Sequence, residues 1–276
     1  MEEIIAGKHA VLEALRSGRT VNKIWLAQGS APHQLQAVVE EAKKLGVMYQ
    51  FVDRRKLDQM VDKDIRHQGV VAQAAPYEYA DLEDLFQAAK ERGEAPFFVI
   101  LDEIEDPHNL GSILRTSLFL GASAVGITRH GSAPLSPVTL KASSGAAESL
   151  PLFIIPSLPH FLTTTRQNGW TVFAACARDP SVRKNRRHWD LDDVRREEPL
   201  RKGGCVLVLG SEGEGLERAT VKKADYEVAV PGGGGAAQRV GVESLNVGVA
   251  AGLVVEAFMG GVLKAKEGSS GSGELW

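Results

Sequence analysis

Residues 96–128 read PFFVILDEIEDPHNLGSILRTSLFLGASAVGIT and contain two apolar runs, FFVIL and AVGIT, separated by a polar loop and an amphipathic segment. Short apolar runs without alternation are typical of strands that are buried on both faces. Pro107, Asn109 and Gly111 are turn-forming residues at the point where the first strand would give way to a helix. The stretch therefore predicts a strand–helix–strand unit with parallel strands.

The same alternation continues along the rest of the chain. Strands are expected at FFVIL, AVGIT, LPLFII, TVFAACA, CVLVLG and YEVAV, and helices near Asn109, Pro137, Leu158, Leu216 and Ser244. Apolar strands that alternate with helices indicate an α/β fold whose parallel sheet is covered on both faces. Residues 178–202 interrupt the pattern with charges of both signs, which is typical of a solvated loop.

The chain up to residue 78 predicts a small α/β domain of its own. Its expected strands are VNKIWLA, VMYQFVD and GVVAQAAP, and its expected helices lie in GKHAVLEALRSG, QLQAVVEEAKKLG and RRKLDQMV. Residues 79–95 predict a charged linker helix, and the second domain is expected at 96–262. Residues 263–276, which end in GSSGSGELW, predict a flexible tail.

Composition narrows the class of protein. Hydrophobic residues make up 43% of the 276 positions and charged residues 24%, which is typical of a globular protein. The net charge of -3 means that any surface for nucleic acid must be a local patch. Cys176 and Cys205 show no C-x-x-C spacing, so neither a zinc site nor a disulfide framework is indicated and a reducing compartment is expected. No apolar run reaches membrane-spanning length, and the N-terminus resembles neither a secretory signal nor a transit peptide.

Three loops carry the residues that a fold alone does not require. In the first, Asn109 is expected to cap a helix, Gly111 to allow a close turn, and Arg115 to follow about one and a half turns into the helix. The second is GSEGEG, residues 210–215, which follows a buried strand. Its spacing is not the dinucleotide fingerprint and it lacks the Lys-Ser/Thr of a phosphate-binding loop. Glu212 and Glu214 would repel a phosphate, so the loop suits a ligand with a cationic or polar part.

The third loop is the glycine-rich stretch after Val230, and it leads to Ser244, Leu245 and Asn246 at the start of an apolar helix. Serine and asparagine at a helix start are most often caps. The small residues Gly248 and Gly252 would let another backbone approach, either in the core or across a dimer.

Together and in this order, N-x-G-x-x-x-R, G-x-E-G-x-G-L and S-L-N-V-x-V-A-A-G resemble the three motifs of the SpoU/TrmH branch of the SPOUT methyltransferases. IIAGKHAVLEALRSG and HQGVVA resemble the substrate-binding domain of its RlmB group, which methylates guanosine 2′-hydroxyls of large-subunit ribosomal RNA. GVESLNVGVAAGLVVEAF and the lengthened region 178–202 look more like the mitochondrial counterpart of that group.

The resemblance implies a C-terminal domain with a trefoil knot that binds S-adenosylmethionine, and 2′-O-methylation of a guanosine in the peptidyl transferase region. Its catalytic residues would be Asn109, Arg115, Glu212, Ser244 and Asn246. Its cofactor-binding residues would be Ala175, Cys176, Leu209, Gly210, Gly213, Val230, Pro231, Gly232, Leu245 and Asn246. Arg115 would act by clamping a phosphate and supporting the alkoxide, because a guanidinium is hard to deprotonate.

The resemblance also implies a homodimer, no metal, and ribosomal RNA as partner. Candidate RNA contacts are Arg16, Arg19, Lys23, Arg54, Arg55, His67, Arg129 and Lys141. The basic run 183–187 precedes several carboxylates and is interpreted more readily as a solvated loop. The alternatives are a transfer RNA methyltransferase, an inactive RNA-binding assembly factor and a nucleotide-dependent oxidoreductase. The missing G-x-G-x-x-G fingerprint argues against the oxidoreductase. The expected compartment is the mitochondrial matrix, with the bacterial cytoplasm as the alternative.

Overall fold

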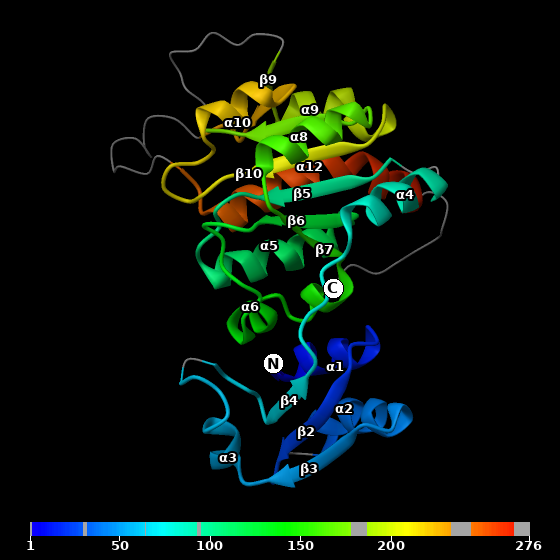
Figure 1. Cartoon of the computed structure of the whole chain (residues 1–276), viewed down its shortest axis with the longest axis vertical. Helices are drawn as coiled ribbons and strands as arrows, with labels where there is room; N and C mark the ends of the chain where they lie inside the picture. The colour runs from blue at the N-terminus through cyan, green and yellow to red at the C-terminus, as the bar shows by residue number, and fades with distance from the viewer. Residues whose placement is uncertain are drawn as a thin grey trace. The chain divides into compact units, whose positions relative to one another are not determined.

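A computed structural model of the chain describes residues 2–29, 32–63, 65–92, 95–177, 187–232 and 244–267 (Figure 1). The chain divides into two compact units. Unit 1 holds the chain up to Tyr79 together with Asp106–Arg115 and Ala133–Pro151, and unit 2 holds Ala80–Glu105, Thr116–Ser132 and the chain from Leu152 onward. The units therefore do not coincide with the contiguous domains that the sequence suggested, because two later segments fold with the N-terminal residues.

Unit 1 contains a mixed sheet of four strands in the order β1-β4-β2-β3. The strands are β1 (Glu3–Ala6), β2 (Val21–Ala27), β3 (Met48–Val52) and β4 (Val70–Ala74). β4 pairs antiparallel with both β1 and β2, whereas β2 and β3 are parallel. β1 is not predicted from the sequence, since its four residues are too few to show a clear alternation.

The helices of unit 1 are α1 (Lys8–Arg16), α2 (Pro32–Leu45), α3 (Arg54–Asp58), α6 (Pro137–Ala142) and α7 (Ala146–Ser149). Helix α5 (Pro107–Phe119) belongs to unit 1 up to Arg115. Leu57 of α3 and Val138 of α6 pack with Ala6, Ala27 and Val71 on one face of the sheet. Because α6 contacts β1, and α7 contacts α1, the segment 133–151 is part of the hydrophobic core of this unit.

Unit 2 contains a sheet of seven strands in the order β7-β6-β5-β10-β8-β11-β9. Every neighbouring pair is parallel. The strands are β5 (Phe97–Leu101), β6 (Ala124–Thr128), β7 (Leu152–Ile155), β8 (Thr171–Ala175), β9 (His188–Asp190), β10 (Cys205–Leu209) and β11 (Tyr226–Ala229). The expected parallel α/β sheet is confirmed.

The helices of unit 2 are α4 (Leu82–Arg92), α8 (Leu158–Gln167), α9 (Leu191–Glu197), the 3₁₀ turn η1 (Pro199–Arg201), α10 (Arg218–Lys223) and α12 (Val247–Glu267). Phe98 of β5 packs with Phe86 of α4 and Phe161 of α8 on one face. On the other face, Phe258 of α12 stacks on Phe97 at 4.9 Å between ring centroids and meets Phe173 edge-on at 4.8 Å. Because alternate strand residues point to opposite faces, the sheet lies between two helical layers (Figure 1).

The charged region after residue 186 is ordered, which corrects the expectation of a solvated loop. β9 pairs with β11 and extends the sheet, and Trp189 packs on Tyr226 with ring centroids 4.3 Å apart. Asp190 and Asp193 form a capping box at the start of α9, and Arg195 binds Glu256 of α12 at 2.7 Å. The charges thus build a helix cap and a helix–helix ion pair, a use that composition does not distinguish from solvation.

Several expectations fall wholly or partly outside the described residues. Residues 183–186 and 233–243 are among them, so the basic run except Arg187 and the glycine-rich loop beyond Gly232 are not described. The trefoil knot stays a prediction. The expected tail is corrected in part, because α12 continues to Glu267. Among the described helices, none has the length and apolar character needed to cross a membrane.

Replacing Phe258 with alanine should lower the free energy of unfolding by about 3–5 kcal/mol, because it opens a cavity between α12 and the two aromatic rings of the sheet. Chemical denaturation followed by circular dichroism would measure the change. Lys222→Ala, at an exposed position of α10, is the matched control and should shift stability by less than about 0.5 kcal/mol. Equal stability of the Phe258 variant and wild type would contradict the assigned core.

Candidate active site

Helix α5 begins at Pro107, two residues earlier than the sequence suggested. The Asp106 carboxylate accepts a hydrogen bond from the backbone N–H of His108 at 2.8 Å, so Asp106 caps the helix. Asn109 was expected to be the cap, and this is corrected. It lies in the first turn, where its Nδ2 donates to Oδ2 of Asp106 at 3.3 Å. The cap therefore holds the carboxamide of Asn109 at the start of the helix.

Gly111 is a packing residue within α5 rather than the close turn that its type suggested. A β-carbon placed on it would lie 2.5 Å from Cβ of Ala142, 2.7 Å from the carbonyl oxygen of Thr139 and 2.9 Å from the backbone nitrogen of Ser143. Such distances are far inside van der Waals contact, and two of them involve backbone atoms. Glycine at this position therefore brings α5 directly against the backbone of α6.

This close packing places Arg115 beside the turn between α6 and α7, which we call the α6–α7 corner (Ser143–Gly145). Nη1 of Arg115 donates to Oγ of Ser144 at 3.2 Å, and the arginine is exposed. Ser144 has a φ of 52° and Gly145 a φ of 92°. The left-handed region is unusual for serine, so the corner fixes the direction of its side chain at a cost in backbone strain. Sequence reasoning missed Ser144, although the adjacent glycine in SSG is a turn signal.

Near the corner, Lys141 and Arg66 form a pair of like charges. Burial lowers the pKa of the Lys141 ammonium, and the charge of Arg66 lowers it further. A group whose pKa is lowered by a neighbouring cation lies in a positive potential, which attracts anions. Unit 1 therefore presents positive charge near the turn that holds Arg115.

In unit 2, the candidate cofactor residues gather at the edge of the sheet where the parallel strands end, here called the carboxyl edge. β5, β10, β8 and β11 are neighbours and end at Leu101, Leu209, Ala175 and Ala229. Loops at this edge of an open α/β sheet are the usual ligand-binding position. Leu209–Gly215, Ala175–Cys176 and Val230–Gly232 therefore lie at adjacent strand ends, as the sequence suggested.

The loop after β10 is tightly folded. A β-carbon on Gly210 would lie 2.3 Å from the carbonyl carbon of Gly215 and 2.5 Å from the backbone nitrogen of Leu216. The backbone N–H of Gly215 donates to the carbonyl oxygen of Ser211 at 3.1 Å, and Gly215 has a φ of 70°. Glu212, Gly213 and Glu214 are exposed at the tip. Gly210 and Gly215 are thus required by the close return of the loop, which carries two carboxylates.

Helix α12 runs from the carboxyl edge toward the opposite edge. Its Met259 lies against Gly121, which precedes β6, and its Phe258 stacks on the first residue of β5. At about 1.5 Å per residue, the helix start at Val247 lies about 16 Å along the axis from Phe258, which is roughly the length of one strand of the sheet. The start of α12 is therefore at the carboxyl edge. Asn246 caps this start, since its Oδ1 accepts bonds from the N–H groups of Gly248 at 2.9 Å and Val249 at 3.3 Å. Ser244, Leu245 and Asn246 are exposed there.

The cysteine thiols are protonated groups rather than nucleophiles. Burial raises the pKa of Cys176 to about 12, and the charge of Glu227 adds to this shift. Burial alone raises the pKa of Cys205 to about 12. A thiol with this pKa contains almost no thiolate at neutral pH, so Cys176 can contribute only shape and packing to the carboxyl edge.

Asp102 at the end of β5 was not identified from the sequence. Burial raises the pKa of its carboxyl group, with further contributions from Glu103 and Glu217 that outweigh a hydrogen bond from Thr128. Its backbone N–H donates to the carbonyl oxygen of Leu209 at 2.8 Å. The only signal in the sequence was the acidic run DEIED after a buried strand. Within the described residues, no group of histidine, cysteine and carboxylate side chains could hold a metal ion.

Comparison with known proteins decides the family. Residues 96–256 match the model of the SpoU rRNA Methylase family, and residues 4–80 match that of the RNA 2′-O ribose methyltransferase substrate-binding domain. The chain belongs to the SpoU/TrmH family of methyltransferases. It is accordingly an S-adenosylmethionine-dependent RNA 2′-O-methyltransferase by family.

Relatives and solved structures agree with this SpoU/TrmH assignment. The chain is 43% identical to a putative TrmH family tRNA/rRNA methyltransferase of Bacillus subtilis, over 92% of this chain and 93% of that protein. It is 37% identical to a Staphylococcus haemolyticus protein of the same description, over 92% and 94%. The fold is similar to the SpoU methyltransferase AviRb of Streptomyces viridochromogenes, solved with AdoMet, with a TM-score of 0.73, 20% identity and coverage of 95% and 91%.

The donors at the carboxyl edge fit the SpoU/TrmH cofactor. S-Adenosylmethionine carries a sulfonium cation and no phosphate, and the loop after β10 supplies Glu212 and Glu214 with no lysine or arginine between Leu209 and Leu216. Carboxylates favour a nearby cation and disfavour a phosphate. The chemistry of the loop therefore suits this cofactor better than a dinucleotide.

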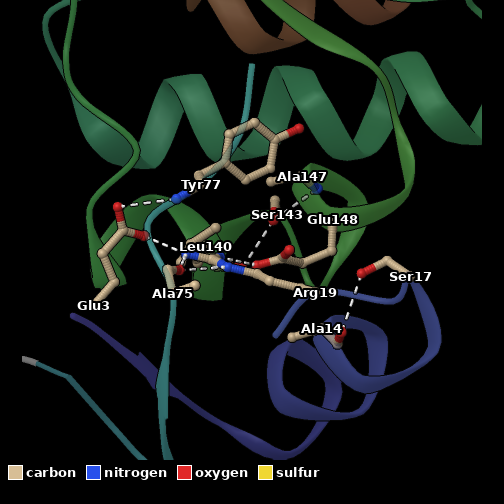
Figure 2. A network of polar contacts seen from close by, with 10 residues as sticks. All are labelled: Glu3, Ala14, Ser17, Arg19, Ala75, Tyr77, Leu140, Ser143, Ala147 and Glu148. Carbon is tan, nitrogen blue, oxygen red and sulfur yellow. Dashed lines mark hydrogen bonds and ion pairs between the residues drawn. The ribbon is translucent and has the colours of Figure 1, made fainter. Parts of the chain in front are cut away.

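Two expected RNA contacts of this SpoU/TrmH protein are corrected by the structure. The Arg19 side chain is 7% exposed and its guanidinium is bonded to Glu148, Glu3 and the carbonyl oxygen of Ala75 (Figure 2). His67 is 3% exposed, binds Asp58 through Nε2 at 2.9 Å and accepts the N–H of Gly69 through Nδ1. Both side chains stabilise unit 1 and are not available to a phosphate.

The remaining expected RNA contacts lie at or near the surface. Arg16, Arg54, Arg55 and Arg129 are exposed. Lys23 is partly buried, with its ammonium 5.4 Å from the ring centroid of Trp25. Arg16 forms an ion pair with Glu13 at 3.1 Å, a surface pair that is worth little and that RNA could replace.

Gly210→Ala should abolish detectable binding of S-adenosylmethionine, because its β-carbon would overlap backbone atoms of the loop that cannot move independently. Gly213→Ala is the matched variant at the loop tip, where nothing lies within 4 Å of a β-carbon, and its melting temperature should match wild type. Calorimetric titration and thermal unfolding would measure the two properties. Wild-type affinity in the Gly210 variant would exclude this loop from the cofactor site.

Proposed function

We propose that the protein transfers the methyl group of S-adenosylmethionine to the 2′-hydroxyl of a guanosine in large-subunit ribosomal RNA, in the peptidyl transferase region. The observation that carries the proposal is the exposed guanidinium of Arg115, held by Ser144 at 3.2 Å on a strained turn. Support for the substrate comes from the motifs IIAGKHAVLEALRSG and HQGVVA, which resemble those of the ribosomal RNA enzymes.

The cofactor would be held at the carboxyl edge of unit 2. Backbone groups of Gly210, Val230 and Leu245 are proposed to bind its adenine and ribose ends, with Ala175, Cys176, Leu209, Gly213, Pro231 and Gly232 completing the pocket. When bound, it supplies an activated methyl group with a good leaving group. Glu212 is proposed to act near the sulfonium or a substrate group, and Ser244 and Asn246 near the target nucleotide. The capping bonds of Asn246 give that residue a defined orientation.

Arg115 would act on the substrate as a permanent cation. A guanidinium remains protonated in proteins and carries five N–H donors. The bond to Ser144 fixes one of its nitrogens, so the direction of the remaining donors is restricted. We propose that they bind the phosphate of the target nucleotide and stabilise the charge that develops on its 2′-oxygen, with Asn109 orienting this group.

RNA would bind through cations of unit 1. Lys141 and Arg66 place two like charges near the α6–α7 corner, where burial first and then the charge of Arg66 lower the pKa of Lys141. Arg16, Lys23, Arg54 and Arg55 are further proposed contacts, together with Arg129 of unit 2. Phosphate contacts of this kind supply affinity and positioning, while the choice of nucleotide needs contacts to bases.

A homodimer is part of the proposal. Val249 at 53%, Leu253 at 38% and Leu245 at 47% exposure recur every four residues on and just before α12. Phe119 of α5 is 72% exposed. A β-carbon on Gly252 would lie 3.5 Å from Thr116, so the end of α5 and α12 are neighbours within unit 2. A second copy of this chain is the occupant that we propose for this apolar surface.

The setting that we propose is the bacterial cytoplasm. Relatives that are 34–43% identical include proteins of Bacillus and Staphylococcus, which supports this alternative over the mitochondrial matrix. Transfer RNA stays the second candidate substrate, because the curated relatives are described as tRNA/rRNA methyltransferases. An inactive assembly factor is disfavoured by the presence of every motif residue.

The activity can be tested with labelled S-adenosylmethionine and, in parallel reactions, a transcript of the peptidyl transferase region and bulk transfer RNA, each followed by digestion to nucleosides. Wild type should place label in 2′-O-methylguanosine. Arg115→Ala should reduce the rate by about 10²–10³, because a charge-stabilising donor is removed. Label in transfer RNA alone would favour the second candidate, and label in a base would overturn the reaction.

Leu253→Glu should convert the dimer to a monomer, since it places a charge in the centre of the proposed apolar interface. Light scattering coupled to size-exclusion chromatography would measure the mass of each species. Lys222→Glu on α10 introduces a carboxylate at an exposed position elsewhere and should remain a dimer. A monomeric wild type at all concentrations would overturn the dimer.

A further inference from the structure

Arg19 lies at the centre of a buried polar network in unit 1 (Figure 2). Its Nε and Nη2 donate to the carbonyl oxygen of Ala75 at 3.1 and 2.8 Å. Its Nη1 donates to Oε1 of Glu148 at 2.5 Å, and Nη2 also binds the carboxylate of Glu3. The guanidinium carbon is 5.6 Å from the ring centroid of Tyr77. One residue that precedes β2 thus joins β1, the end of β4 and α7.

Arg19 is the counter-ion of the buried Glu148 carboxylate. The Glu148 side chain is 2% exposed. Burial raises the pKa of the Glu148 carboxyl group, whereas the charge and hydrogen bond of Arg19 lower it. Glu3 is the other charged group that acts on Glu148, and it is repulsive. Without Arg19, a buried carboxylate would lack its counter-ion, so it would either take up a proton or draw α7 toward water.

Helix α7 is too short to hold its own position. It has four residues, Ala146–Ser149, and a single helical turn gains little from its own hydrogen bonds. Its position must therefore come from tertiary contacts. One of these contacts is the buried ion pair between Glu148 and Arg19.

The α6–α7 corner packs against two further elements of unit 1, helices α1 and α5. A β-carbon on Gly145 would lie 2.5 Å from Cγ of Glu13 and 3.2 Å from the carbonyl oxygen of His9, so α1 packs directly on this glycine. Gly111 of α5 presses on the backbone of Ser143 from its own side. A displacement of α7 would therefore be transmitted to Ser144, the residue between these two contacts.

We propose that Arg19 is a positioning residue for methyl transfer. By pairing with Glu148 it holds the α6–α7 corner, and the corner presents Oγ of Ser144 to Arg115. This inference rests on the role proposed for Arg115. It also assigns the small N-terminal sheet a part in orienting the reacting groups, in addition to binding RNA.

Arginine is needed at position 19 for geometric reasons. Its planar fork reaches a carbonyl oxygen and two carboxylates together, whereas a lysine ammonium is a single point charge on a flexible stem. Arg19→Lys should keep the charge that Glu148 requires but not the fixed direction of the contacts. Arg19→Met should remove both.

The test compares Arg19→Met, Glu148→Gln and the double variant in single-turnover methyl transfer to the peptidyl transferase transcript. Arg19→Met should lower the rate constant about tenfold to a hundredfold, as expected for misplacement of a reacting group. Its dissociation constant for S-adenosylmethionine should stay within about twofold of wild type, since the proposed cofactor residues belong to unit 2. The double variant should recover most of the rate, because the neutral carboxamide that replaces the Glu148 carboxylate needs no counter-ion.

A second double-mutant cycle, between Arg19 and Ser144, tests whether Arg19 acts through the α6–α7 corner. Ser144→Ala removes the partner of Arg115 and keeps the backbone turn. If Arg19 acts only by placing Ser144, the double variant Arg19→Met with Ser144→Ala should be no slower than the slower single variant. Multiplied effects would overturn the proposed route.

Two control variants distinguish a loss of positioning from a loss of folding. Val38→Ala creates a cavity at a fully buried position of α2 and should lower the melting temperature while keeping the rate at a temperature below melting. If Arg19→Met does not fold, Arg19→Lys is decisive, since it keeps the charge. A folded lysine variant with a reduced rate and wild-type cofactor affinity supports the proposal, and one with the wild-type rate overturns the requirement for the fixed guanidinium contacts.

Failure of this inference is distinguishable from failure of the proposed function. A wild-type rate in Arg115→Ala would remove the catalytic role of Arg115 and the positioning role of Arg19 together. A slow Arg115→Ala with a folded Arg19→Met at the wild-type rate would overturn the positioning role alone.

Discussion

Burial of the seven-stranded parallel sheet on both faces is the constraint on which unit 2 depends. Each strand must place apolar side chains on alternate sides, so helical layers cover both faces and loops are confined to the two edges. Phe97 and Phe98 show the division, because one meets α12 and the other meets α4. The loops after β10, β8 and β11 therefore lie side by side at the carboxyl edge, where the ends of parallel strands leave room for a ligand.

Unit 1 is held by a different kind of contact, in which backbones approach each other at glycines. Gly111 brings α5 against α6, and Gly145 brings α1 against the α6–α7 corner. These contacts leave no space for adjustment, so the strained conformation of Ser144 is maintained by its surroundings. The buried pair of Arg19 and Glu148 completes this arrangement from the side of the small sheet.

Local patterns predicted the secondary structure well and the roles of individual polar residues less well. Nearly every strand of the large sheet was visible as an apolar run, since two-sided burial leaves no alternative to continuous hydrophobicity. Asn109 and Gly111 were correctly located near the start of a helix, but their roles were not. The cap that was assigned to Asn109 is Asp106, and Gly111 lies within α5 and forms no turn. Arg19 and His67 were taken for surface cations, because sequence does not show which charges find partners in the interior.

The sequence by itself determined the α/β class, the order of most strands and helices, and the family, because these depend on periodicity and on motifs that are contiguous in the chain. Only the tertiary structure decided that residues 133–151 fold with the N-terminal sheet, that the charged segment 188–201 extends the large sheet, and that Arg115 meets Ser144. Each of these depends on contacts between residues far apart in the sequence. Such contacts are selected by shape and by the pairing of buried charges, and neither leaves a periodic trace in the chain.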